Sequence, residues 1–291
     1  MTELKQIVIF GLISGGIYAL LAVGFSLIFG VARIINLSHT AFYMLGGYLI
    51  YSFAVSAGLN LYASIVVAVI AVVIIGIFSY RIIIDPVRRH ETTILIVTLA
   101  LAIIIQESLS EVYGDDRLRV PKMISGYTEI LGVKVFNQLI LAFGVALSAL
   151  LATWALLMKT RLGIAIRSTA QDREIANLMG INVGRMGLIT MGIAVALAAV
   201  AGALVAPAFS LVPHMWMSPL VMILAVVVLG GLGSIKGSLL GAFILGFAEN
   251  MVVFLAPSGA FLKEAAALSI MLIVILIRPQ GLFGVSFEEE R

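Results

Sequence analysis

The sequence predicts an all-α integral membrane protein, a polytopic bundle of about nine transmembrane helices (eight to ten) with the N-terminus outside and the C-terminus inside. Hydrophobic residues make up 62% of the chain and charged residues 11%, whereas a soluble domain is about half apolar and about one quarter charged. The apolar residues form long charge-free runs rather than amphipathic patterns. We therefore expect one transmembrane domain over residues 1–291.

The charge-free runs of the first half provide five crossings. A helix needs about 20 residues to cross about 30 Å of hydrocarbon, because each residue rises 1.5 Å. Residues 6–32 form one span, and residues 34–80 form two, separated by a break near Gly58-Leu59-Asn60. The short run 92–106 and the run 135–158 provide one span each.

The second half provides four more crossings. Residues 186–235 contain no Lys, Arg, Asp or Glu and are long enough for two spans. Proline ends helices by removing a donor, so Pro207, Pro213 and Pro219 are expected to make the turn between them. One further span covers 237–262, interrupted only by Glu249, and the short run 265–277 completes the nine. Both short runs could instead be re-entrant.

The basic residues predict the orientation, because Lys and Arg are retained on the cytoplasmic side. With the N-terminus outside, twelve of the 18 basic residues fall inside. The inner set is Arg33, Arg81, Arg88, Arg89, Lys159, Arg161, Arg167, Arg173, Arg185, Lys236, Arg278 and Arg291. The outer set is Lys5, Arg117, Arg119, Lys122, Lys134 and Lys263.

The inner loop 159–186 is predicted to contain a short amphipathic helix between two spans. Ser168 or Thr169 can cap its start, Asp172 and Glu174 suit the positive end of the helix dipole, and Gly180 stops it. One face of this helix consists of Ile175, Leu178 and Met179. Such a helix can lie on the membrane or dock into a groove of a soluble partner, and its mixed charge favours the partner.

Four segments spread along nearly the whole chain carry a further signal, and they are GGIYALLAVGFSLIFGVARIINLSH (15–39), YMLGGY (43–48), VVLGGLGSIKGSLLGA (227–242) and RPQGLFG (278–284). In order and spacing they resemble the permease subunits of branched-chain amino acid ABC importers, in particular the shorter of the two permeases. The loop adds a pattern similar to the ATPase-docking loop of that family. Its residues are Gly163, Ala165, Arg167, Ala170, Gln171, Asp172, Ala176, Gly180 and Ile181.

The resemblance implies an importer permease that moves branched-chain or similar small amino acids and is driven by other chains. The implied partners are two ATP-binding-cassette ATPases, a second, homologous permease in a heterodimer, and an extracytoplasmic substrate-binding protein. This chain would carry no cofactor, because ATP is bound by the partners, and it would sit in the prokaryotic inner membrane with a cytoplasmic tail at 278–291. The residues expected to couple to the ATPase are Gly163, Ala165, Arg167, Ala170, Asp172, Glu174, Ala176, Leu178 and Gly180.

A solute path is expected where polar groups interrupt the spans. An intramembrane carboxylate such as Glu249 is expensive, and it either serves function or pairs with a polar group of a neighbouring helix. The run Gly230-Gly231-Leu232-Gly233-Ser234 is either a short cytoplasmic turn or a gate. The candidates for the path are Asn36, His39, Gly231, Gly233, Ser234 and Glu249.

Other functions find less support in the sequence. Permeases for urea or short-chain amides are closely similar and remain an alternative. An ion-coupled secondary carrier would need more ionisable residues in the spans than Glu249.

The sequence also lacks the common motifs of nucleotide, catalytic and metal sites. No Gly-Lys dipeptide, HExxH or Gly-x-Ser-x-Gly occurs and there is no cysteine, so we predict no ATP site, catalytic residue or metal site, and no enzyme. A motorless channel or scaffold is disfavoured only by the loop. The scattered charge does not indicate nucleic-acid binding.

Overall fold

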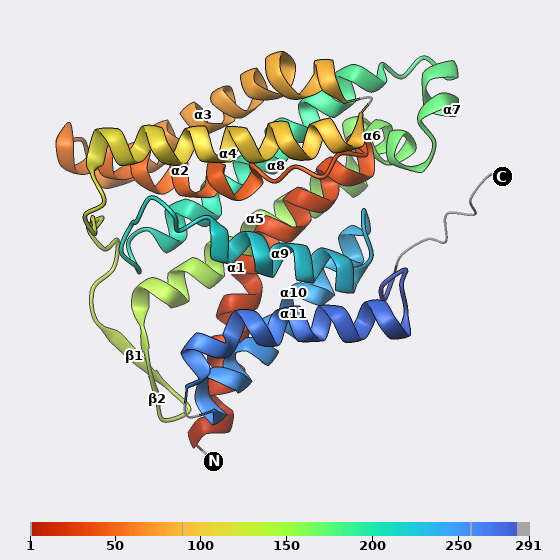
Figure 1. The fold of residues 1–291 in the computed structure, drawn as a ribbon. Coiled ribbons are helices and arrows are strands. Elements are labelled where there is room, and N and C mark those ends of the chain that lie inside the picture. Colours follow the sequence, from red (N-terminus) through yellow and green to blue (C-terminus); the bar gives the residue numbers. More distant parts are fainter. Residues whose placement is uncertain (1, 89, 257, 284–291) are drawn as a thin grey trace.

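A computed structural model of the protein describes residues 2–88, 90–256 and 258–283. Arg89, Arg291 and the part of the predicted tail at 284–291 lie outside the described residues. The described chain is mainly helical, as Figure 1 shows. Its longer helices are α1 (Thr2–Ala32), α2 (His39–Tyr51), α3 (Leu61–Ser79), α4 (Glu91–Tyr113), α5 (Asn137–Lys159), α8 (Val183–Val205), α9 (Met217–Gly230), α10 (Ile235–Leu255) and α11 (Gly259–Ile277).

Each predicted apolar segment contains one of these helices, but not all of them are long enough to cross a bilayer. Within the described residues, seven helices are long and apolar enough to span. The exceptions are α2, which has 13 residues and continues as a π-helix over Ser52–Ser56, and α9, which has 14 residues. A helix of this length reaches only about 20 Å. The multi-span helical fold is therefore confirmed, while the count of nine crossings stays a prediction.

The predicted break at Gly58-Leu59-Asn60 separates α2 from α3. Gly58 has a φ of +68°, which favours glycine. The Asn60 side chain accepts a hydrogen bond of 2.9 Å from Tyr62 N and so caps α3.

The prolines of the second half also lie where the sequence predicted a turn. Pro207 and Pro213 lie in the link between α8 and α9, and Pro219 lies in the first turn of α9.

The boundary between the last two spans differs from the predicted one. The sequence suggested spans over 237–262 and 265–277, but α10 ends at Leu255 and α11 already begins at Gly259. The run has no charge between Glu249 and Lys263, so charge alone could not locate the turn. As a result Lys263 lies in the second turn of α11 rather than in a loop.

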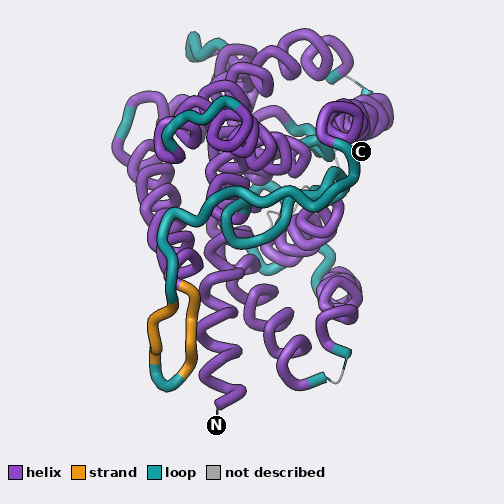
Figure 2. The backbone as a smooth tube through the Cα atoms, turned by 90° about the vertical axis from the view of Figure 1, so that its left-hand side faces the viewer, coloured by secondary structure: helices purple, strands orange, loops and turns teal. Residues whose placement is uncertain are grey.

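A β-hairpin that the all-α prediction did not contain precedes α5. Strand β1 (Tyr127–Ile130) pairs antiparallel with β2 (Val133–Phe136), so that Ile130 lies opposite Val133. Leu131 and Gly132, with φ values of +53° and +84°, form the two-residue connection. Figure 2 shows the hairpin beside the N-terminal part of α1. It packs there through Val133 and Val135, which are buried with Ile9 and Ile13 of α1.

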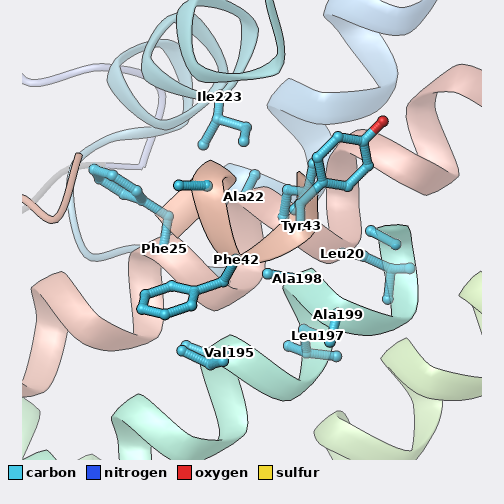
Figure 3. Packing of buried hydrophobic residues seen from close by; sticks show 14 of the residues in the cluster. Leu20, Ala22, Phe25, Phe42, Tyr43, Val195, Leu197, Ala198, Ala199 and Ile223 are labelled. Carbon is cyan, nitrogen blue, oxygen red and sulfur yellow. The ribbon is translucent and has the colours of Figure 1, made fainter. Parts of the chain in front are cut away.

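Helix α1 runs through the middle of the bundle and packs against α10, α8, α5 and α9. In Figure 3 the side chains of Leu20, Ala22 and Phe25 from α1 lie among residues of α2, α8 and α9. The outer helices α3, α5 and α11 instead expose most of their apolar residues. Since exposed aliphatic side chains are favourable only in lipid or against a partner, these helices form the natural outer face of a membrane protein.

Glycine allows the closest helix contacts, as the small-residue rule for membrane bundles predicts. A Cβ added to Gly246 of α10 would lie 2.7 Å from the backbone nitrogen of Gly15 in α1. One added to Gly202 of α8 would lie 2.1 Å from the carbonyl oxygen of Tyr43 in α2. Both distances are shorter than a carbon atom allows, so α1–α10 and α2–α8 touch backbone to backbone.

The residues after α11 close onto the end of α9. The Leu282 N–H donates to Leu229 O over 2.8 Å, and the Phe283 N–H donates to Gly230 O over 3.0 Å. The last carbonyl groups of a helix have no partner within the helix itself. The segment 278–283 therefore provides a C-terminal cap for a helix that lies far earlier in the chain.

Candidate functional site

The loop between α5 and α8 folds as two short helices rather than one. They are α6 (Arg161–Gln171) and α7 (Arg173–Leu178), and Figure 1 shows them at the opposite end of the molecule from the hairpin. We call these two ends the α7 end and the hairpin end. The sequence predicted one short amphipathic helix that begins at Ser168 or Thr169 and stops at Gly180, whereas the structure has two helices that meet at Asp172.

The predicted caps at Ser168 and Thr169 are wrong. Helix α6 begins earlier, where the Thr160 hydroxyl accepts a hydrogen bond of 3.0 Å from Gly163 N. Asp172, with an extended backbone, caps α7 instead, because its Oδ1 accepts from Glu174 N and Ile175 N, each over 2.9 Å. Thr169 is buried inside α6, where its hydroxyl donates to Ala165 O. The carboxylate of Asp172 can accept two amides at once, which makes it the better cap.

Helix α7 and the residue that follows it carry three exposed apolar side chains. Ile175, Leu178 and Met179 are 58%, 85% and 78% exposed, as their shared face predicted. Gly180 ends the segment with a φ of +83°, as expected. An apolar patch of this kind on a polar loop is typical of a surface that contacts a partner protein or the membrane. We call Ile175, Leu178 and Met179 the α7 patch.

The α7 patch is fixed to the core by contacts behind it. Arg33 Nη2 donates to Ala170 O over 3.3 Å, and Arg173 Nη1 donates to Ala32 O over 3.2 Å, so that both arginines join the loop to the end of α1. Burial lowers the pKa of the Arg173 guanidinium below its usual value, and the positive charge of Arg88 lowers it further. Arg173 is therefore held in place rather than freely solvated.

The predicted coupling residues differ in exposure: some lie on the surface of the loop, and others are buried or half-buried beneath it. The exposed members are Arg167, Asp172, Glu174, Leu178 and Gly180. Gly163 and Ala176 are buried, and Ala165 and Ala170 are half-buried. An added Cβ at Gly163 would lie 2.2 Å from Leu157 O, so this glycine lets α6 turn back tightly against α5. The predicted set therefore contains both buried residues that pack the loop against the helices and exposed residues on its surface.

A second region of interest is a cavity of about 710 Å³ near the hairpin end. Its wall comes from α1, the start of α5, the link between α8 and α9, and the adjoining ends of α10 and α11. Apolar side chains such as Ile13, Ile17, Leu21 and Val205 form part of it. A cavity of this size with a few convergent polar groups is typical of a small-solute site.

Glu249 is the acidic residue in this cavity. It is 8% exposed, and its Oε1 lies 3.6 Å from Lys263 Nζ of α11. Oε2 has no hydrogen-bond partner of ordinary geometry, although the Tyr18 hydroxyl lies near enough to interact with the carboxylate. Next to it, Asn250 Nδ2 donates to Ser14 Oγ over 3.3 Å. The expectation of a polar partner on a neighbouring helix is met, and the pair faces a cavity.

Donor groups line other parts of the same cavity. Gln138 is fully buried, its Oε1 accepts from Met123 N, and its Nε2 has no partner. Lys122 and Lys134 also line the cavity. The Lys122 ammonium lies 5.1 Å from the centre of the Phe136 ring, and the Lys134 ammonium lies 5.1 Å from the centre of the Tyr127 ring. Sequence reasoning missed Lys263 and Tyr18, which approach Glu249, and Gln138, which lines the same cavity, because all three positions depend on how the helices pack.

The other path candidates lie elsewhere. Asn36 Oδ1 accepts from Ser38 N and Oγ within the link between α1 and α2, while His39 Nε2 is 3.1 Å from Leu21 O of α1. Gly231 and Gly233, with φ values of +97° and +81°, form the turn from α9 to α10, and Ser234 caps α10 by accepting from Gly237 N. Of the six candidates, only Glu249 borders the cavity of about 710 Å³.

Known proteins resemble the chain along most of its length. Residues 7–278 match the family model for the permease component of branched-chain amino acid transport systems. The permease protein LivH of the high-affinity branched-chain amino acid transport system of Escherichia coli K12 is 30% identical over 94% of this chain and 93% of its own. BraD of Pseudomonas aeruginosa, a permease protein with the same description, is 29% identical over 94% of both chains.

A solved structure shares the fold. The structure of PsaBC from Streptococcus pneumoniae in complex with Fab superposes with a TM-score of 0.52 over 94% of this chain and 93% of the matched chain. The sequence identity in this comparison is 17%, so it supports the arrangement of the helices and nothing more.

Proposed function

The chain belongs to the family of permease components of branched-chain amino acid transport systems, and we propose from this premise that it carries branched-chain or similar small amino acids across the membrane. It is a multi-pass permease subunit of an ATP-binding-cassette importer in the prokaryotic inner membrane. Permease subunits transport solutes and are not enzymes.

We further propose that α7 docks onto a separate ATPase. The supporting observation is the α7 patch, three exposed apolar side chains on a capped helix that is anchored to α1 through Arg33 and Arg173. A rigid connection of this kind transmits movement from a docked partner to the spans. ATP is bound by the two ATPase subunits, and this chain needs no cofactor of its own.

The complete importer in this proposal contains a second, homologous permease, two ATPases and an extracytoplasmic binding protein. The N-terminus and the hairpin face the outside, and α7 faces the cytoplasm. In support, the α7 end holds Arg33, Arg88 and Arg173 of the predicted inner set, whereas Lys122, Lys134 and Lys263 of the outer set line the cavity near the hairpin end. The binding protein delivers solute to that cavity.

The docking proposal is tested by co-purification with the ATPases of the same importer. Leu178→Ser and Ile175→Ser together remove most of the apolar surface of α7, and we expect recovery of the ATPase with the tagged permease to fall about tenfold or more, as for the loss of buried interface anchors. Leu131→Ser is the matched control, because Leu131 is similarly exposed, at 67%, but lies in the hairpin.

Undiminished recovery with the α7 variants would contradict the docking proposal and favour a scaffold without a motor. Transport is measured with the complex in proteoliposomes. Uptake of L-leucine should require ATP inside, and uptake driven by an ion gradient alone would indicate a secondary carrier. Uptake of urea in place of L-leucine would favour the amide alternative.

A further inference from the structure

The distance between the charged groups of Glu249 and Lys263 is long for an ion pair inside a membrane protein. A buried carboxylate is costly unless it is paired and hydrogen-bonded. The 3.6 Å between Glu249 Oε1 and Lys263 Nζ exceeds the 2.7–2.9 Å of a strong charge-assisted hydrogen bond. Oε2 accepts no hydrogen bond of ordinary geometry. The carboxylate therefore retains capacity for a second, closer ammonium donor.

The two partners differ in how firmly they are held. Glu249 belongs to α10, which touches α1 backbone to backbone at Gly246, less than one turn away. The side chain of Glu249 is 10% exposed, whereas that of Lys263 is 34% exposed. Lys263 is carried by α11, which leaves most of its side chains exposed at the surface of the bundle. The acid is therefore fixed, and the flexible lysine can withdraw toward solvent.

The cavity also offers groups for an anion at positions other than Glu249. Gln138 Nε2 is a buried donor without a partner, and Lys122 and Lys134 add positive charge to the wall. Apolar side chains of α1, including Ile13, Ile17 and Leu21, line the space as well. An acceptor for a cation, donors for an anion and an aliphatic wall together match an aliphatic amino acid, whose ammonium, carboxylate and side chain have these same requirements.

We propose that this cavity is a solute-binding site within the permease and that it works by exchange of the counter-ion of Glu249. In the empty site Lys263 neutralises Glu249, and the ammonium group of an incoming amino acid displaces Lys263 while the amide of Gln138 donates to the solute carboxylate. Lys263 is thus a competitor of the solute. The proposal rests on the proposed transport of amino acids and assigns the solute contacts to this chain.

The exchange selects for a charged amine. Urea and short-chain amides carry no ammonium group, so they cannot compensate Glu249 when Lys263 leaves. A solute that leaves a buried charge unpaired is rejected strongly, because the site then bears the desolvation cost of that charge. The same site accepts different aliphatic side chains, since an apolar wall distinguishes one methylene only weakly.

The test uses the absence of native cysteine in this chain. Ser218→Cys places a thiol in the wall of the cavity, and its modification by a cationic methanethiosulfonate reagent is followed by mass spectrometry of this chain in the assembled permease–ATPase complex without binding protein. L-leucine should slow the modification in a saturable manner, whereas 4-methylpentanoate, which lacks the amine, should not. Ser125→Cys, in the exposed loop outside the cavity, should be modified equally with and without L-leucine.

The two charged partners are expected to change protection in opposite directions. With Glu249→Gln the concentration of L-leucine that gives half-protection should rise about tenfold or more, since a charge-assisted pair is lost. With Lys263→Gln that concentration should fall, because the internal competitor is gone. Glu129→Gln in the hairpin is the matched control for the acidic variant and should have no effect.

Each other outcome overturns one defined statement. Equal loss of protection in both charged variants would mean that the pair only stabilises the fold, and protection by 4-methylpentanoate would remove the role of the amine. If L-leucine gives no protection in the Ser218→Cys parent although the complex takes up L-leucine with ATP, the solute binds elsewhere and only this inference fails. If ATP-driven uptake of L-leucine is also absent, the proposed function fails.

Discussion

Gly246 shows how a single residue without a side chain determines the packing of two long helices. The backbone of α10 lies against α1 at this point, and an added Cβ would be 2.8 Å from Gly15 Cα and 2.9 Å from Gly11 O. Backbone atoms cannot rotate away as a side chain does, so any substitution separates the helices. The acid three residues later, Glu249, would move with them.

Gly246→Ala is therefore expected to destabilise the protein by about 1–3 kcal/mol, the usual cost of overpacking. Gly144→Ala in α5 is the control, because nothing lies within 4 Å of a Cβ at that position. There the better helix propensity of alanine should stabilise the protein by up to about 1 kcal/mol. Thermal unfolding of the purified protein in detergent gives both shifts, and a shift of the same sign for the two variants would contradict the account of Gly246.

At this scale the sequence predicted that Glu249 matters but not what it touches. An acid in an apolar run is visible without a structure, because its cost in a membrane is general. Its partner Lys263 was assigned to a loop, since the charge-free run between the two residues conceals the helix ends at Leu255 and Gly259. The identity of a buried partner depends on packing, which no local pattern contains.

Helix α7, the element that we propose to dock onto the ATPase, begins at a cap of its own. It is separated from α6 by Asp172, whose extended backbone ends one helix and whose carboxylate begins the next. The direction in which the α7 patch points is therefore set by this one cap. The patch has only six helical residues behind it, too few to form a stable helix without support.

Asp172→Ala should reorient or fray α7, because loss of an N-cap costs about 1 kcal/mol. We expect the affinity of the permease for its ATPase to fall about fivefold, which corresponds to that energy. Asp172→Asn retains a cap oxygen and should stay close to the parent. Affinity is measured by titrating the purified ATPase onto immobilised permease, and similar loss in the Asn and Ala variants would show that charge rather than capping is responsible.

Among the elements, the helix caps of the loop and the β-hairpin could not be predicted from the sequence. The exposed apolar face and the stop at Gly180 were predicted correctly, since both depend on local spacing and backbone preference. Ser168 and Thr169 were preferred as caps by residue type, yet Thr160 and Asp172 cap because the chain is extended at their positions. The alternation in Val133–Phe136 is a strand signal, but it is too short to be recognised among nine apolar segments.

The whole molecule is polarised, with the α7 patch at one end and the hairpin and the charged cavity toward the other. We propose which end faces which side of the membrane from the distribution of basic residues. The sequence predicted the helical membrane fold, because composition and charge-free runs are global properties. It could not predict that α2 and α9 are short helices inside the bundle, since apolarity alone does not distinguish lipid from protein surroundings.

The orientation is checked with single cysteines in the cysteine-free chain. Leu131→Cys in the hairpin should react with a membrane-impermeant maleimide in intact cells, whereas Lys236→Cys at the start of α10, near the α7 end, should react only after the cells are permeabilised. Both positions are exposed at the protein surface, so a difference in reactivity reports the side of the membrane. The reverse pattern of labelling would place the N-terminus in the cytoplasm.

The amides of Leu282 and Phe283 donate hydrogen bonds to the carbonyl groups at the end of α9, although both residues are translated well after α9. A ribosome that has just synthesised α9 has not yet made the residues that cap its end, because α10 and α11 are translated in between. Until then Leu229 O and Gly230 O lack the amide partners that they have in the finished bundle. Completion of the bundle depends on the arrival of residues translated well after α9 itself.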